Sequence, residues 1–237
     1  MALPKIGYPT YELELPSTGK TVKYRPFLVK EEKVLLLALE AKDEKQIIGA
    51  VKDLIKNCVI SRIKVETLPS FDLEYLFLKI RAASIGENIS LTVTCTDDNE
   101  TKVEAQIDIN SVEVFKPEGH DKKIMFDDKT GLVMKYPSMK EFIDNEFLQK
   151  EMKTDQVYDF IAESIDQIFD DEEVYDSTTT TKKEFRTFVD TLTTKQFEKI
   201  QQFYVTCPKL RHTFTVTNPK TGKECEYTIE GLQSFFA

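Results

Sequence analysis

Residues 11–26 read YELELPSTGKTVKYRP, two short alternating segments joined by a turn. The apolar residues of the first segment alternate with glutamates, which is the period of a strand with one buried face. The central PSTG supplies turn chemistry, and Pro26 ends the second segment because proline lacks an amide hydrogen. The sequence therefore predicts an antiparallel β-hairpin near its start.

Helical patterns follow this hairpin. Residues 34–41 are a run of strong helix formers, and apolar side chains in residues 47–58 recur at the spacing of a helix with one buried face. A third helix is expected to open with Ser70 as its N-cap and to stop near Gly86. We expect the three helices to pack on one another and on the hairpin.

Three more hairpins are expected, each a pair of alternating segments around a polar turn. The pairs are residues 89–95 with 103–109, residues 122–126 with 132–136, and residues 214–217 with 226–229. The first and last pairs share Thr and Val before a polar turn. A degenerate internal duplication is one explanation, and the commonness of such strands is the other.

The second half of the chain returns to helical spacing after residue 138. Helices are expected over residues 154–169, 182–192 and 197–204. Three capping boxes mark helix starts, pairing Ser138 with Glu141, Thr181 with Glu184, and Thr193 with Gln196. The acidic and threonine-rich residues 170–180 are expected to form a mobile loop.

These elements predict an α+β fold of short antiparallel β-hairpins and segregated α-helices. Pro117 and Gly119 interrupt the pattern and suggest a boundary between two lobes. Residues 1–116 would hold the N-terminal hairpin, the helices and the central hairpin. Residues 117–237 would form a helical region that ends in a β-hairpin. A single interwoven domain is the alternative.

Composition restricts the partners. The 237 residues carry 32 basic and 41 acidic side chains, a formal charge of -9. This balance argues against a nucleic-acid partner, because such binding relies on Lys and Arg at phosphates. No stretch approaches the ~18 uninterrupted apolar residues of a membrane span, and the first residues lack the pattern of an export signal. We therefore expect no membrane span.

The sequence predicts neither a metal nor a cofactor. Structural zinc takes four ligands, usually in close pairs, whereas Cys58, Cys95, Cys207 and Cys225 are far apart along the chain. Scattered cysteines of this kind fit reduced thiols. The acidic residues 170–173 are consecutive and lack the central Gly of an EF-type calcium loop.

No catalytic residue is assigned. The sequence contains no GxSxG elbow, no Gly-rich phosphate loop and no HExxH motif. A Ser–His or Cys–His pair would have to use His120, expected in a surface turn, or His212, expected at the start of a strand. The chain is predicted not to be an enzyme, with a metal-dependent hydrolase as the alternative.

Three phrases, taken together and in this order, resemble the baseplate hub protein family of T-even-like contractile-tailed bacteriophages. They are residues 11–33, 71–87 and 207–236, so the likeness spans nearly the whole chain. The opening hairpin also looks like tail-assembly chaperones of other contractile phages. Family members often place cysteines in the turns of two hairpins, which implies a zinc knuckle. This chain keeps Cys95 and Cys225 there but lacks their close partners.

The resemblance implies a late phage protein that helps to build the hub at the centre of the tail baseplate, without enzymatic activity. Its partners would be other tail and hub proteins, and its oligomeric state is left open. Its locations would be the virion tail baseplate and, during assembly, the host cytoplasm. An assembly chaperone absent from the mature virion is one alternative, and a cellular adaptor is another.

Such a role requires contact surfaces rather than a pocket. Aromatic side chains bury large areas at interfaces, and sheet edges accept partner strands. We therefore predict six partner-binding residues, with core packing as the competing interpretation of the aromatic ones. They are Tyr24, Arg25 and Phe27 at the end of the first hairpin, Arg81 on the third helix, and Phe235 and Phe236 at the tail.

Overall fold

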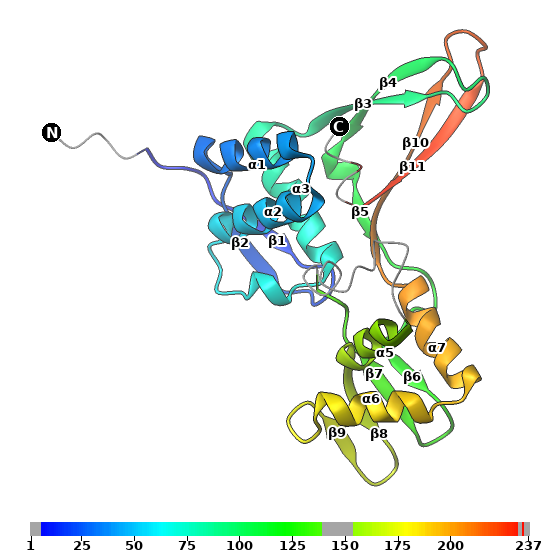
Figure 1. Ribbon diagram of the computed structural model, residues 1–237. Coiled ribbons are helices and arrows are strands. Elements are labelled where there is room, and N and C mark those ends of the chain that lie inside the picture. The colour runs from blue at the N-terminus through cyan, green and yellow to red at the C-terminus, as the bar shows by residue number, and fades with distance from the viewer. Residues whose placement is uncertain (1–5, 139–153, 232–233, 235–237) are drawn as a thin grey trace, which may run out of the picture. The chain divides into compact units, whose positions relative to one another are not determined.

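The computed structural model describes residues 6–138, 154–231 and 234 (Figure 1). Within these residues it confirms an α+β fold, with helices and small antiparallel sheets of two to four strands. The chain divides into two compact units. Unit 1 comprises Met1–Phe115 and Lys209–Ala237, and unit 2 comprises Lys116–Pro208.

The opening hairpin of unit 1 is confirmed. Strands β1 (Tyr11–Glu14) and β2 (Thr21–Tyr24) pair antiparallel, with Tyr11 opposite Tyr24. Gly19 in the connecting turn has a φ of +68°, a left-handed conformation that glycine adopts at little cost. The turn chemistry read from the sequence therefore has the expected backbone geometry.

The three helices that follow are also confirmed. Helix α1 (Val29–Ala41) packs on α2 (Glu44–Cys58), and α2 packs on α3 (Ser70–Ile85). The core of this part is formed by fully buried side chains of the helices and the hairpin. They include Leu15, Val22, Ile55, Cys58, Leu76, Phe77 and Ile80.

The start of α3 differs from the prediction. Ser70 is the first helical residue and Pro69 is the N-cap, without a capping side chain, so the assignment of Ser70 as N-cap was wrong. Asp72, which is fully buried in the first turn, accepts a hydrogen bond from the Ser17 amide at 3.0 Å and another from the Ser17 hydroxyl. A carboxylate is favourable at this end of the helix dipole, and here it ties α3 to the first hairpin.

Two longer hairpins complete unit 1. Strands β3 (Asn88–Thr94) and β4 (Lys102–Asp108) form one, and β10 (Lys209–Thr217) and β11 (Glu224–Glu230) form the other. Both were predicted, the second with shorter strands. Their pairing is regular along the whole length of each.

One strand of unit 1 was not predicted. Strand β5 (Glu113–Phe115) pairs with β10, so the sheet order is β11-β10-β5. Three residues are too few to show an alternating pattern, so only the tertiary pairing identifies this strand. Through this pairing Lys209–Ala237 joins unit 1, whereas the lobes expected from sequence placed the last hairpin in the second lobe.

Unit 2 combines a four-stranded antiparallel sheet with three described helices. The sheet order is β6 (Lys123–Met125), β7 (Gly131–Met134), β8 (Ile165–Phe169) and β9 (Val174–Asp176). The helices are α5 (Thr154–Glu163), α6 (Lys182–Thr191) and α7 (Thr194–Val205). A single apolar cluster joins the sheet to the helices.

Residues 154–169 do not form one helix as predicted. The helix α5 ends at Glu163, and Ile165–Phe169 is the strand β8, paired with β7. Its isoleucines suit a strand as well as a helix, and the available partner strand decides the outcome. At the start of β7, position 131 must be glycine. A Cβ there would lie 2.5 Å from the carbonyl oxygen of Ile124 on the neighbouring strand β6.

Residues 170–180, expected to be a mobile loop, form a tight turn, the strand β9 and a second turn. In the first turn the Asp170 carboxylate accepts the amides of Glu172 and Glu173 at 2.9 and 2.8 Å. In the second turn the Asp176 carboxylate accepts the Thr178 amide at 2.8 Å. Aspartates commonly organise turns in this way.

The capping boxes at Thr181 and Thr193 are confirmed, each with its reciprocal partner three residues later. In the box at Ser138 and Glu141, Glu141 lies outside the described residues. Across the described part of the chain, no helix combines the length and the apolar character that crossing a membrane requires.

Candidate functional site

The first group of predicted contact residues is buried inside unit 1. Tyr24, Arg25 and Phe27 are only 6–8% exposed. The Tyr24 ring stacks on Tyr11 at a centroid distance of 5.6 Å, and the Phe27 amide donates to the Ser84 hydroxyl at 2.9 Å. These contacts give the three residues a packing role, and a direct contact with a partner stays a prediction.

Arg25 is the polar centre of this group. Its guanidinium contacts Glu31 with an Nη2–Oε1 distance of 3.1 Å, and both side chains are buried. It also donates to the carbonyl oxygens of Pro26 at 2.8 Å and Asn57 at 2.9 Å. Arg25 therefore connects the end of β2 to the first turn of α1 and to the end of α2.

Glu31 remains charged in this setting. Burial alone would raise its pKa, but hydrogen bonds from the Leu28 amide and the Arg25 guanidinium outweigh burial and hold the pKa below its ordinary value. The nearby thiol of Cys58 behaves oppositely, because burial raises its pKa to about 11. Cys58 is thus a neutral core residue.

The other predicted contact residues lie elsewhere. Arg81, on α3, is partly buried, and within the described residues its Nη1 atom is enclosed without a hydrogen-bond acceptor. Burial lowers the pKa of this guanidinium. Phe235 and Phe236 lie outside the described residues. The structure therefore brings together Tyr24, Arg25 and Phe27.

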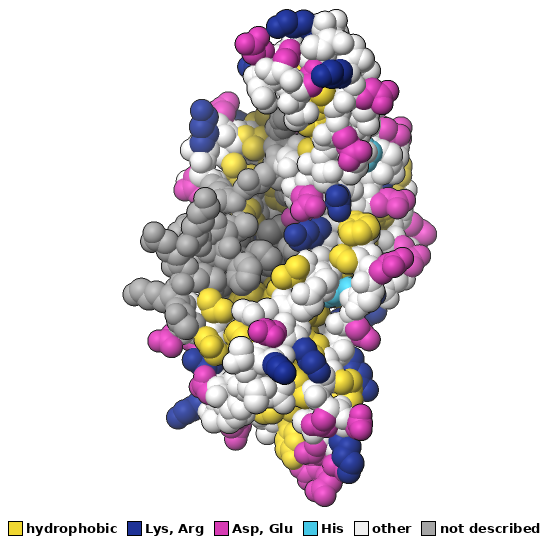
Figure 2. All heavy atoms as spheres, turned by 90° about the vertical axis from the view of Figure 1, so that its right-hand side faces the viewer, with side chains coloured by type: hydrophobic (Ala, Val, Ile, Leu, Met, Phe, Trp, Pro, Cys, Tyr) yellow, Lys and Arg dark blue, Asp and Glu magenta, His cyan; other side chains and the backbone are white. Residues whose placement is uncertain are grey.

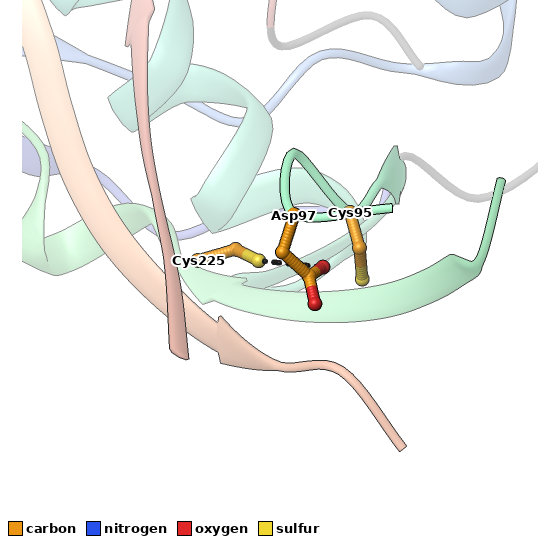
Figure 3. Close-up of side chains that lie close together, drawn as sticks. All are labelled: Cys95, Asp97 and Cys225. Atoms are coloured by element: carbon orange, nitrogen blue, oxygen red, sulfur yellow. Dashed lines mark hydrogen bonds between the residues drawn. The ribbon is translucent and has the colours of Figure 1, made fainter. Parts of the chain in front are cut away.

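A second cluster lies where the two long hairpins meet (Figure 3). It contains Cys95 and Cys225, which the family resemblance had singled out, and Asp97, which was not predicted. The Asp97 carboxylate, in the β3–β4 loop, accepts hydrogen bonds from Asn218 at 2.8 Å, Thr221 at 2.5 Å and the Cys225 thiol at 3.4 Å. The bonds from Thr221 and Asn218 are the main reason that the Asp97 pKa lies below its ordinary value. We call Asp97 and its three hydrogen-bond donors the Asp97 clasp.

Buried side chains pack beside the Asp97 clasp. Cys95 and Cys225 are buried and form a small cluster with Ala105 and Val216. Burial raises the pKa of the Cys95 thiol, and the neighbouring Cys225 and Asp97 raise it further. The buried Cys95 thiol is therefore neutral.

Cys95, Asp97 and Cys225 carry atoms of the kinds that bind zinc. The sulfur atoms of Cys95 and Cys225 and a carboxylate oxygen of Asp97 all lie within 4.8 Å of one another. A closed structural zinc site takes four ligands, and among the described residues this group offers three. The Asn218 amide and Thr221 hydroxyl direct hydrogens at the carboxylate, so they compete with a cation. The donor set does not fit a closed zinc knuckle.

The turn expected at His120 is present, because its amide donates to the Pro117 carbonyl at 3.2 Å, but its side chain is buried rather than at the surface. Its Nδ1 lies 2.9 Å from the Thr206 hydroxyl and its Nε2 lies 3.1 Å from the Tyr136 hydroxyl. Thr206 already donates to the Gln202 carbonyl, which makes Nδ1 the donor and leaves Nε2 to accept from Tyr136. Both ring nitrogens are thus used in packing, and burial lowers the pKa of the ring.

Charge on the visible surface follows the composition. Figure 2 shows Lys and Arg side chains scattered among Asp and Glu side chains on one face of the molecule. No continuous basic area appears on that face among the described residues. Phosphate binding depends on such concentrations of positive charge.

The local sequence gives a signal for Glu31 but none for the Asp97 clasp. Glu31 stands three residues after Leu28, the spacing of a capping box, although Leu28 has no capping oxygen. The convergence of Asp97 and Asn218 spans 121 residues of sequence, and nothing in either loop alone predicts it.

Comparison with known proteins gives one match. The family model described as T4 bacteriophage base plate protein matches residues 8–237. No curated protein and no solved structure matches the chain.

Proposed function

The chain belongs to the T4 bacteriophage base plate protein family, and on this premise we propose that it is a non-enzymatic protein of the baseplate hub. It acts through contacts with other hub and tail proteins. The observation that carries the proposal is the extent of the family match, which runs through both compact units. The narrower assignment to the hub is supported by the likeness of residues 11–33, 71–87 and 207–236 to hub proteins.

The buried contacts suggest how the candidate residues contribute. Arg25 and Phe27 hold the end of the first hairpin against α1, α2 and α3. Through these internal contacts they fix the positions of the elements that form the surface of unit 1. Arg81 differs from them, because its enclosed Nη1 has no acceptor within the described residues. We assign the exposed part of the Arg81 side chain, and not the enclosed Nη1, to a carboxylate or carbonyl oxygen of a partner protein, since a guanidinium gains most from such a partner.

The proposed location follows from the proposed role. The chain assembles in the host cytoplasm and is carried in the tail baseplate of the virion. A chaperone version leaves before the particle is complete. Mass spectrometry of purified virions separates the two, because only a structural subunit is retained in stoichiometric amounts.

The test is affinity purification of the tagged full-length chain from infected cells, followed by mass spectrometry. We expect hub proteins to co-purify with the parent chain and with a control, Lys195→Met, which removes an exposed charge from α7. We expect Arg81→Met to reduce that recovery while leaving the circular dichroism unchanged. If the only baseplate proteins recovered are ones from outside the hub, the hub assignment is overturned. If Arg81→Met recovers as much hub protein as the parent chain, the role of Arg81 is overturned.

A further inference from the structure

Helix α1 carries an apolar face on its outer side. Its inner side buries Leu35 and Ala38, as a surface helix should. Its outer side exposes large apolar side chains that such helices usually replace with polar ones. They are Val29 at 79%, Leu36 at 52% and Leu37 at 55% exposure, while Val34, at 51%, lies beside the buried side of the helix. Gathered on a single helix, exposed apolar side chains commonly mark an interaction surface.

Two exposed charges flank the centre of this face. Lys33 and Glu40 are seven residues apart, so they lie two helical turns from each other along one line, about 10 Å apart. Leu36 and Leu37 lie midway between them. Within the described residues, neither Lys33 nor Glu40 has an ion-pair partner.

This pattern complements itself in one orientation. When a second α1 lies antiparallel, with a twofold axis passing between positions 36 and 37, Lys33 of each copy faces Glu40 of the other. The leucines of the two copies then meet at the axis. A parallel pair in register would instead place Lys33 beside Lys33 and Glu40 beside Glu40. Isologous contacts of the antiparallel kind are the commonest arrangement in homo-oligomers.

We infer that α1 is a self-association surface and that the occupant of its apolar face is α1 of a second copy of this chain. Among the described residues of its own unit, α1 packs mainly against α2 (Figure 1), and the side chains of Val29, Leu36 and Leu37 are exposed. The helix has only 13 residues, so the interface is smaller than that of a stable complex. The dimer is therefore weak and depends on concentration. This inference does not depend on the hub assignment.

Analytical ultracentrifugation of the full-length chain over a wide concentration range tests the dimer. We expect a reversible monomer–dimer equilibrium in the parent protein. Leu36→Glu should make the chain monomeric throughout that range. The matched control is Val205→Glu, which changes an exposed apolar residue at the end of α7 and should leave the equilibrium as it was.

Charge exchange tests the orientation. Lys33→Glu should weaken the dimer by about tenfold, because it replaces two attractive pairs with two repulsive ones. Glu40→Lys should act similarly, and the double variant Lys33→Glu/Glu40→Lys should restore the parent affinity. A parent chain that stays monomeric overturns the proposal. A dimer that ignores Leu36→Glu, or single variants that the double variant fails to rescue, overturns it as well.

The alternative occupant of this face is an apolar helix from another protein. In that case the parent chain is monomeric and Leu36→Glu removes a tail protein from the affinity purification. That outcome overturns the dimer and leaves the hub assignment standing. Circular dichroism and thermal unfolding of every variant confirm that the fold is retained.

Discussion

Arg25 in unit 1 and Arg186 in unit 2 are both surrounded by partners, but their settings differ. Arg25 is buried and pairs with a single carboxylate, that of Glu31, which is also buried. Arg186 lies at the surface of α6, near the carboxylates of Asp155, Asp159 and Asp190, which are 54–94% exposed. A count of ion pairs would predict that Arg186 contributes more to stability than Arg25. Burial reverses that order, because an exposed pair is screened by water whereas a buried charge that loses its partner is not compensated.

The largest expected effect is that of Arg25→Met. The substitution keeps much of the side-chain volume but removes the buried guanidinium from Glu31 and from two backbone carbonyls. Glu31 keeps only the Leu28 amide and the exposed Lys30. Breaking a buried pair in this way costs about 3–5 kcal/mol of unfolding free energy. Urea unfolding followed by circular dichroism measures the loss. A loss below about 1 kcal/mol would remove the basis of the comparison.

The pH dependence of unit 1 sharpens the same comparison. Because the pKa of Glu31 lies below its ordinary value, its contribution to stability is present above that ordinary value and is lost as the pH falls through its folded pKa. We therefore expect the parent chain to lose more stability than Glu31→Gln between pH 5 and pH 3, approximately the window set by an ordinary glutamate pKa of about 4.3.

The variant Glu31→Gln is needed as a control because Asp72 also titrates when the pH falls. Burial raises the pKa of Asp72, so protonation of Asp72 favours the folded state as the pH falls. The two effects oppose each other in the parent chain, and only the difference between the parent and Glu31→Gln isolates Glu31. Identical pH profiles for the two proteins would contradict the assigned charge of Glu31.

The Asp97 clasp is an intermediate case, a carboxylate held by several donors at the surface. Asp97→Asn keeps the shape but removes the charge that strengthens the bonds from Asn218 and Thr221. We expect hydrogen exchange in the two hairpin loops to speed up by about tenfold, with little change in global unfolding, since loops open locally. Thr178→Val, at a turn of unit 2, is the control. Unchanged exchange in both loops would show that apolar packing alone joins them.

The smallest expected effect is that of Arg186→Met. Surface ion pairs contribute about 1 kcal/mol or less, and salt screens them. The guanidinium also lies over the Tyr158 ring at 4.9 Å, a contact that methionine partly replaces. We therefore expect a loss below about 1 kcal/mol that shrinks in high salt. A loss as large as that for Arg25→Met would show that the number of partners outweighs burial.

The same contrast explains what the sequence could predict. The hairpins and most helices have local causes, such as the alternation in residues 11–15 and the capping boxes at Thr181 and Thr193. Their boundaries follow from side chains that are neighbours in the chain. The overall α+β class was therefore readable from the sequence.

The errors share a different cause. Residues 165–169 were assigned to a helix because isoleucines fit both periods, and only the pairing with β7 makes them a strand. The strand β5 is defined by β10, about a hundred residues later. The burial of Arg25, the burial of His120 and the Asp97 clasp are likewise set by distant segments. Physical contacts that close long loops leave little trace in the local sequence.

The pairing of β5 with β10 also sets an order of events during protein synthesis. The middle strand of that three-stranded sheet and its neighbour β11 are synthesised after every residue of unit 2. Unit 2 is thus an insertion within unit 1, and it can close while its host is still waiting for residues 209–230. Domains usually complete themselves in order from the N-terminus. In this chain the inner unit is free to finish before the outer one.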